Sequence, residues 1–148
     1  MPARGIHHVD LAVSDVERSL AFYVDLLGLE LRDRGEAAGG SFEITGLRNP
    51  SVRWADLLLD RGQVLELIEY QRPRGQAHRA EPNDPGASHL ALRVDDAAAV
   101  HSCLTEAGTM TRSAPTVIDE PGPWHGARAF YATDPDGVIL ELIEPAAP

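Results

Sequence analysis

Apolar and polar residues alternate over two stretches of the chain, residues 6–13 and 89–94. Val9, Leu11 and Val13 share one face of the first predicted strand, and Leu90, Leu92 and Val94 share one face of the second. A histidine, His8 in the first stretch and His89 in the second, lies on the opposite face. This alternation predicts two strands, each with one face on a hydrophobic core and the other face in more polar surroundings.

Each of these strands is followed by a stretch with helical spacing of apolar residues. For the first helix we expect Ser14 as the N-cap, Glu17 as its reciprocal partner, and Gly28 at the end. The second helix is expected to begin at Asp95 or Asp96. Apolar runs then predict two hairpins, with arms at 52–59 and 64–70 and at 127–133 and 138–144.

The pattern therefore gives β-α-β-β-β twice, with a short extended segment at 29–32 in the first copy. A Pro- and Gly-rich segment, residues 71–87, separates the copies and is incompatible with a helix or a central strand over most of its length. The predicted fold class is α+β. We expect a single domain over 1–148, with module one at 4–70, a linker at 71–87 and module two at 88–145.

The last strands of the two modules are nearly identical in sequence. Val-Leu-Glu-Leu-Ile-Glu at 64–69 returns as Ile-Leu-Glu-Leu-Ile-Glu at 139–144. A shift of 75 residues places Glu66 on Glu141, and a shift of 81 places His8 on His89. Two copies are too few to stack as a solenoid, so the repeat indicates a duplicated module.

A carboxylate inside an apolar strand requires a compensating partner, because burying an unpaired charge is costly. Each module contains one such carboxylate, Glu66 or Glu141, and one histidine on a strand face away from the core. If each sheet curls around a shared cavity, the four side chains converge. Two imidazoles and two carboxylates suit one divalent ion per chain, such as Ni, Co, Mn, Fe or Zn.

The composition limits the classes of partner. The chain has 148 residues, a net charge of −10 and scattered basic residues, which argues against nucleic acid. The sequence contains no run of 18 apolar residues, so we expect no membrane span. We also find no signal-peptide pattern before the first predicted strand. A single cysteine, Cys103, fits a reducing compartment. We expect a cytoplasmic protein that acts on a small molecule.

These elements resemble the vicinal oxygen chelate superfamily, which includes glyoxalase I, methylmalonyl-CoA epimerase, extradiol dioxygenases and antibiotic resistance proteins. The similarity lies in Ile-His-His-Val-Asp-Leu-Ala-Val at 6–13 and Leu-Glu-Leu at 65–67. It continues in Ser-His-Leu-Ala at 88–91, Asp-Pro-Asp-Gly at 134–137 and Leu-Glu-Leu at 140–142. The resemblance covers nearly the whole chain and implies a curled, open-barrel mixed sheet around a metal site.

The resemblance also implies roles for individual residues. His8, Glu66, His89 and Glu141 become the expected metal ligands. By similarity to glyoxalase, Glu141 is the first choice for the catalytic base and Glu66 the second. The implied activity is that of a metal-dependent lyase or isomerase of glyoxalase or epimerase type. Its substrate would be a carbonyl compound or thioester, and the expected assembly is a homodimer.

Two alternatives stay open at this stage. Extradiol dioxygenases are similar in fold and bind Fe(II) through two histidines and one glutamate, which this chain also contains. Proteins of the bleomycin-resistance type bind a drug or metabolite without catalysis. All four ligand positions of this chain hold ligand-type residues, which favours the lyase and epimerase branch.

Several other residues are candidates for substrate contact. Arg93 shares the face of His89, so it is suited to bind a charged substrate. Arg128 and Trp124 are further candidates, the latter in a loop rich in Pro and Gly. Arg53 corresponds to Arg128 in the repeat, and the register of the hairpins decides which face either arginine occupies.

Three residues near the expected ligands are predicted to have no functional role. His7 is turned away from His8 by strand parity, so we expect it to be exposed or packed by the helix. Glu69 and Glu144 close the two repeated stretches. They share the parity of the core leucines but stand at predicted strand ends, where we expect them to be solvated.

Overall fold

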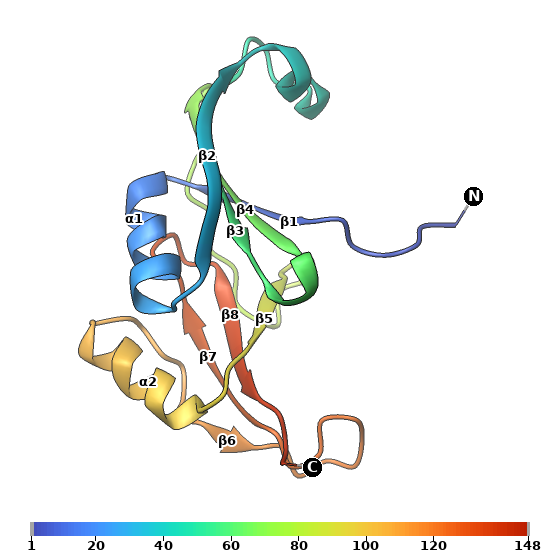
Figure 1. Ribbon diagram of the computed structural model, residues 1–148, viewed down its shortest axis with the longest axis vertical. Coiled ribbons are helices and arrows are strands. Elements are labelled where there is room, and N and C mark those ends of the chain that lie inside the picture. Colours follow the sequence, from blue (N-terminus) through green and yellow to red (C-terminus); the bar gives the residue numbers. More distant parts are fainter. Residues whose placement is uncertain (1, 148) are drawn as a thin grey trace. The chain divides into compact units, whose positions relative to one another are not determined.

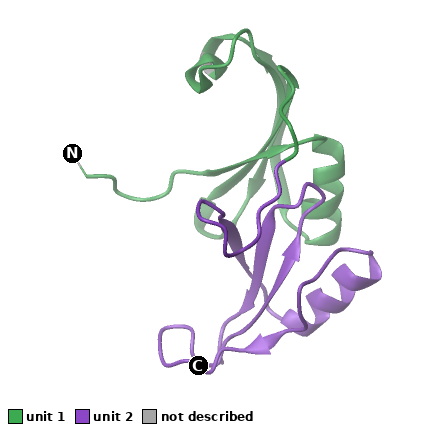
Figure 2. Cartoon of the chain, turned by 180° about the vertical axis from the view of Figure 1, so that it is seen from behind, with its two compact units in different colours: residues 1–77 green, residues 78–148 purple. Residues whose placement is uncertain are grey.

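The computed structural model describes residues 2–147, except for the side chain of Ser41. The chain divides into two compact units, residues 1–77 and 78–148 (Figure 2). The two predicted modules fall one in each unit. Within the described residues, no helix is both long enough and apolar enough to cross a membrane.

Unit one contains a mixed four-stranded sheet in the order β1-β4-β3-β2, with β1 parallel to β4 and the other neighbours antiparallel (Figure 1). A helix formed by α1 and η1 packs on one face. The elements are β1 (Val9–Val13), α1 (Val16–Leu20), η1 (Ala21–Leu26), β2 (Glu30–Ala38), η2 (Gly40–Thr45), β3 (Ser51–Leu58), η3 (Asp60–Gly62) and β4 (Val64–Arg72).

Unit two repeats this topology, with a sheet in the order β5-β8-β7-β6 and β5 parallel to β8. Its elements are β5 (His89–Arg93), α2 (Ala97–Glu106), β6 (Thr116–Val117), β7 (Arg128–Thr133) and β8 (Ile139–Glu144). The predicted α+β class and the two tandem β-α-β-β-β modules are therefore confirmed.

The alternation of the sequence sets the two faces of each sheet. Leu65 and Leu67 of β4 are fully buried on the face that the helix covers, and Leu140 and Leu142 of β8 occupy the same places in unit two. We call this side of each sheet the helix face. The residues between these leucines lie on the opposite side, which we call the open face.

The first helix differs from the prediction at its N-cap. The cap is Asp15, whose carboxylate accepts hydrogen bonds from the N–H groups of Glu17 and Arg18. Ser14 instead accepts a hydrogen bond from the Arg18 guanidinium at 2.7 Å. The prediction of Ser14 was wrong by one residue, because both residue types can cap a helix and the ionised one accepts more strongly. Glu17 pairs with arginines rather than with the cap.

The same helix widens after its first turns. From Ala21 to Leu26 the chain is π-helical, and the Leu27 N–H bonds to the carbonyl of Phe22, five residues earlier. Phe22 and Tyr23 are both buried within this π-helical stretch. Gly28 ends the helix as expected, with φ of 76°.

One predicted strand is longer than expected, and one short strand was not predicted. The predicted extended segment at 29–32 is the start of a nine-residue strand, β2, which runs to Ala38 along the sheet edge. Unit two has a two-residue strand, β6, between α2 and the second hairpin, where no strand was predicted. Charged residues on β2 obscured its alternation, and they suit an edge strand because they discourage pairing with other chains.

The predicted exposure of Glu69 and Glu144, the second glutamates of the repeated stretches, also needs correction. Glu69 is only 7% exposed, and its carboxylate accepts the N–H of Val16, the first residue of α1, at 3.2 Å. Glu144 accepts the N–H of Ala97, the first residue of α2, at 2.9 Å. Glu69 is not a strand end, because β4 continues to Arg72, whereas Glu144 does end β8, with its carboxylate bound to a helix N–H rather than only to solvent. Each binds an N–H group that the first turn of its helix leaves without a partner.

Candidate functional site

The open face of unit one brings together the first predicted pair of ligands. His8 directly precedes β1, and Glu66 lies in the middle of β4 opposite Asp10 of β1. The His8 Nε2 atom is 3.6 Å from the Glu66 Oε2 atom. The Glu66 side chain is 23% exposed, so it is shielded without being fully buried. Strand parity alone predicted this shared face.

Unit two repeats the arrangement. His89 is the first residue of β5, and Glu141 lies in β8 opposite Ala91. The His89 Nε2 atom is 3.2 Å from the Glu141 Oε2 atom, and the Glu141 side chain is 20% exposed. The chain therefore presents two His–Glu pairs of similar geometry, one in each unit.

The spacing of each pair fits two neighbouring ligands of one metal ion. Ligand distances near 2.0–2.2 Å and bond angles of 90–110° place the donor atoms about 2.8–3.5 Å apart. The pair in unit two lies inside this range, and the pair in unit one lies just beyond its upper end. Among the described residues, no group of three or more His, Cys, Asp and Glu side chains is placed to hold an ion. Each unit thus offers two ligands.

The pair in unit one lies among other carboxylates. Asp10 of β1 and Asp56 of β3 are the residues directly across from Glu66 on its two sides. Burial raises the pKa of Glu66, the charges of Asp56 and Asp10 raise it further, and His8 lowers it. Burial also raises the pKa of Asp10, against a lowering effect of His8. This open face therefore concentrates negative charge beside one imidazole.

The pair in unit two has an aromatic neighbour instead. Tyr131 of β7 lies directly across from Glu141, and its ring centroid is 5.3 Å from that of His89 with the rings tilted by 38°. Burial and the charge of Glu141 raise the pKa of the Tyr131 phenol, so it keeps its proton at neutral pH. Tyr70 on the open face of unit one has a raised pKa from burial, Asp10 and Glu66.

The predicted substrate contacts fall in different places. Arg93 is exposed and shares the open face of β5 with His89. Arg128 lies across from Glu144, so it occupies the helix face, opposite to the His89–Glu141 pair. Trp124 is 64% exposed in a loop closed by the hydrogen bond from the Ala127 N–H to its carbonyl. Of the three, Arg93 alone shares a sheet face with a predicted ligand.

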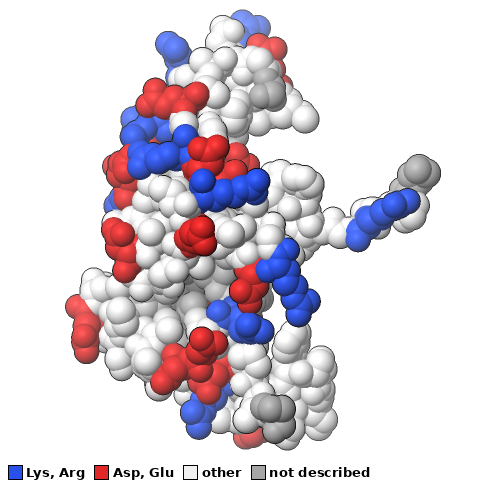
Figure 3. Space-filling view, in the orientation of Figure 1, with Lys and Arg blue, Asp and Glu red and all other residues white. Residues whose placement is uncertain are grey.

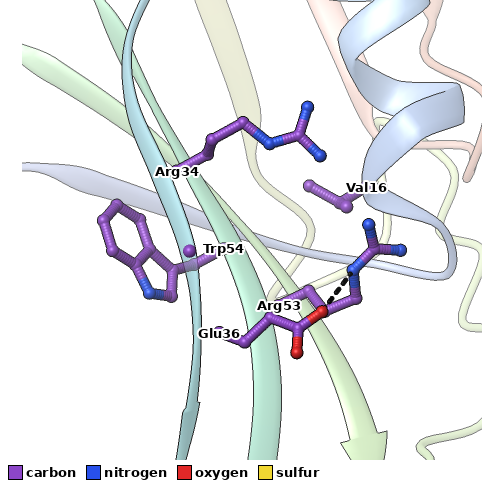
Figure 4. Close-up of a pocket in the computed structure, with 6 residues that line it drawn as sticks. Val16, Arg34, Glu36, Arg53 and Trp54 are labelled. Carbon is purple, nitrogen blue, oxygen red and sulfur yellow. Dashed lines mark ion pairs between the residues drawn. The ribbon is translucent and has the colours of Figure 1, made fainter.

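Arg53 belongs to a separate polar cluster on the helix face of unit one. Its guanidinium is 2.8 Å from Glu17, 3.4 Å from Glu36 and 3.6 Å from Glu69, and Arg34 also pairs with Glu17. Figure 4 shows Arg34 and Arg53 reaching toward Val16, with the Arg53–Glu36 contact dashed. These charges compensate one another on a surface that does not include the His8–Glu66 pair.

A cavity of about 150 Å³ lies beside this cluster, lined by Val16, Arg34, Gly35, Glu36, Arg53 and Trp54. Its two arginines are already paired with carboxylates, so it offers little net charge to an anion. On the face drawn in Figure 3, arginines are interspersed with acidic groups and form no continuous basic area. The His–Glu pairs therefore stand out as the better candidate for chemistry.

Sequence reasoning missed Asp56 and Tyr131 as neighbours of the two glutamates. Both follow from hairpin register, since the β3–β4 pairing sets Asp56 across from Glu66, and Tyr131 stands 75 residues later across from Glu141. The turn lies at Asp60–Gly62, as the sequence predicts, but its position alone does not fix the register of the two strands, because Arg61 adopts a positive φ there. His7 was also set aside, although its ring contacts His8.

Comparison with protein families gives one match over most of the chain. The model of the Glyoxalase/Bleomycin resistance protein/Dioxygenase superfamily matches residues 5–142. Both His–Glu pairs lie inside the matched range.

Curated relatives include enzymes. The 2-epi-5-epi-valiolone epimerase of an Actinomyces species is 32% identical over 146 residues, covering 95% of this chain and 79% of that protein. The lactoylglutathione lyase of Salmonella typhimurium is 33% identical over 144 residues, covering 93% of this chain and 90% of that protein.

Solved structures agree with the fold. A glyoxalase family protein from Bacillus cereus superposes with a TM-score of 0.83 at 22% identity, covering 99% of this chain and 97% of the other. A glyoxalase family protein from Enterococcus faecalis gives a TM-score of 0.65 at 29% identity, covering 95% of this chain and 98% of the other.

Proposed function

Because this chain belongs to the Glyoxalase/Bleomycin resistance protein/Dioxygenase superfamily, we propose that it is a divalent-metal-dependent enzyme of glyoxalase or epimerase type. The proposed ligands are His8, Glu66, His89 and Glu141. The observation that carries the proposal is the repeated His–Glu pair, with N···O distances of 3.6 and 3.2 Å that suit neighbouring ligands of one ion. Relatives named as a lyase and an epimerase support it.

The proposed reaction begins with proton abstraction next to a carbonyl group. A divalent ion held by these residues supplies Lewis-acid stabilisation of the negative charge that develops on the carbonyl oxygen. One glutamate takes the proton, while the C–H electron pair moves toward the carbonyl carbon and the π pair moves to oxygen. Return of the proton to the same carbon gives an epimer, and return to the adjacent carbon gives an isomer. No external oxidant or reductant is consumed.

Two carboxylates are candidates for the base. By similarity to glyoxalase, Glu141 is proposed first and Glu66 second. Each lies beside a histidine on an open face, so each can accept a proton from a substrate bound there. Glu141→Gln and Glu66→Gln variants that retain metal distinguish them. The base variant loses at least about 100-fold in turnover, while the other retains measurable proton exchange.

The proposed substrates are small carbonyl compounds or thioesters. Arg93 shares the open face of His89 and is suited to a carboxylate or phosphate group of such a molecule. S-lactoylglutathione and 2-epi-5-epi-valiolone, the compounds in the names of the relatives, are the first probes. The former carries a thioester and the latter a ketone, so together they sample both proposed substrate classes.

Metal content is the primary test. Protein purified without a metal-affinity tag and equilibrated separately with Ni, Co, Mn, Fe or Zn is expected to hold about one ion per chain by elemental analysis. His8→Ala and His89→Ala are each expected to lose that ion, whereas His78→Ala, an exposed histidine of the linker, retains it. A protein that holds none of the five metals would overturn the proposal.

Proton exchange tests the chemistry. Metal-loaded protein in D2O is expected to incorporate deuterium next to the carbonyl of a substrate, detected by mass spectrometry, and the metal-stripped protein is not. Oxygen uptake with catechols by the Fe(II) form would instead indicate a dioxygenase. Tight binding of a drug that survives in His89→Ala would indicate a binding protein of the resistance type.

A further inference from the structure

His7 and His8 contact each other through their rings. The two Nδ1 atoms are 2.9 Å apart, and the rings are nearly perpendicular, with centroids 5.2 Å apart. Two ring nitrogens at this distance form a hydrogen bond only when one carries a proton and the other accepts it. The contact therefore couples the tautomers of the two neighbouring histidines.

The other nitrogen of His8 indicates the direction of this bond. The His8 Nε2 atom is 3.6 Å from Glu66, beyond the normal range of a hydrogen bond but close to the spacing of two ligands on one ion. If the His8 Nδ1–H donates to His7, then Nε2 presents its lone pair beside the carboxylate. Histidines that bind metals commonly donate their other ring N–H to an acceptor, which fixes both tautomer and ring orientation.

Resting on the metal site proposed above, we infer that His7 is a positioning residue for His8. Its Nδ1 atom accepts the His8 Nδ1–H, and this bond holds the His8 Nε2 atom toward Glu66. His7 itself does not contact the ion. The second module lacks this device, because Ser88 precedes His89 and the ring of Tyr131 lies against that histidine instead.

A measurement on the metal-free protein tests the inference without reference to metal binding. Long-range 1H–15N correlation spectra of protein labelled at the histidine nitrogens report which nitrogen of each ring is protonated. At a pH where both rings are neutral, we expect His8 in its Nδ1–H form, and we expect this form to be depleted in His7→Ala. A His8 ring in the Nε2–H form would overturn the inference.

Zinc affinity supplies the second measurement, by competition with a chromophoric chelator. His7→Ala is expected to bind Zn2+ about 10–100-fold more weakly than the wild type. His7→Asn is expected to stay within about threefold, because its side-chain carbonyl oxygen can accept the same bond. His78→Ala is the matched control and is expected to leave the affinity unchanged.

The outcomes separate the two proposals. Unchanged affinity in His7→Ala overturns the positioning role. An affinity equally weak in His7→Ala and His7→Asn also overturns it, since that result indicates that His7 is itself a ligand. A wild-type protein that binds none of Ni, Co, Mn, Fe and Zn overturns the metal-dependent function, and the tautomer of His8 then still decides whether the His7–His8 bond exists.

Discussion

The open faces of the two modules share a His–Glu pair but differ around it. In unit one, Glu66 has Asp10 and Asp56 directly across from it on the two neighbouring strands. In unit two the matching places hold Ala91 and Tyr131. The duplicated module thus presents a His–Glu pair among acidic residues in unit one and beside an aromatic residue in unit two.

This difference shows that the position of each His–Glu pair and the identity of its neighbours have separate causes. The position of each pair follows from strand parity and from the parallel pairing of the first and last strands, which both modules share. The neighbours can vary without disturbing that framework. In unit one they add negative charge that attracts a cation. In unit two they add a rigid ring against the histidine, which limits its rotation.

The helix faces show a parallel contrast, and here we expect the largest effect. Glu69 is buried, binds the first N–H of α1 and lies 3.6 Å from Arg53. Glu144 binds the first N–H of α2 but is less buried. Glu69→Ala should lower the free energy of unfolding by about 3 kcal/mol, because it leaves a buried donor and a cation without this partner. Glu144→Ala should cost about 1 kcal/mol.

Urea unfolding followed by circular dichroism measures both changes. Glu69→Gln, which keeps an acceptor for the Val16 N–H, is expected to fall between the wild type and Glu69→Ala. A cost for Glu144→Ala that equals or exceeds that for Glu69→Ala would show that burial does not distinguish the two modules.

For Tyr131, the aromatic neighbour of the His–Glu pair in unit two, we expect an effect of intermediate size. Tyr131→Leu removes the ring beside His89, and we expect zinc binding to weaken by about 10-fold as the imidazole gains freedom. Tyr131→Phe keeps the ring and is expected to stay within about twofold of the wild type. Competition with a chelator measures both. Equal weakening in the two variants would mean that the phenol hydroxyl, rather than the ring, supports the site.

Much of this architecture could be predicted because it depends on parity. The period of two along the first and last strands places His8 and Glu66 on one face without any knowledge of loops or turns. The duplication then repeats the assignment for His89 and Glu141. The family resemblance and the α+β class followed from the same pattern, and the comparisons and the fold confirm both.

The predictions that were wrong or missing depend on strand ends and on strand register. Glu69 was taken as a strand end, but β4 continues to Arg72, so its side chain stays beneath α1. Asp56 became a neighbour of Glu66 only through the register of the β3–β4 hairpin, whose turn contains Arg61 at a positive φ of 61°. Local composition does not determine either feature, because tertiary contacts select among several acceptable ends and turns.

The acidic neighbours of unit one give the smallest expected effect, which depends on pH. Because burial and the charges of Asp56 and Asp10 raise the pKa of Glu66 in the folded protein, the folded state binds its proton more readily than the unfolded chain. This contribution to stability is present at low pH and is lost as the pH rises through the raised pKa. Asp56→Asn removes one cause of the shift, so it should stabilise the metal-free protein at neutral pH by about 0.5 kcal/mol.

That gain should shrink as the pH falls through the raised pKa of Glu66, since protonation of Glu66 abolishes the repulsion that the substitution relieves. Urea unfolding at a series of pH values measures it, and Glu43→Gln, at an exposed carboxylate of η2, is the control for the general loss of one charge. A gain for Asp56→Asn that is independent of pH, or that matches the control, would contradict the acidic setting of Glu66. The contrast between the modules would then reduce to the ring of Tyr131 alone.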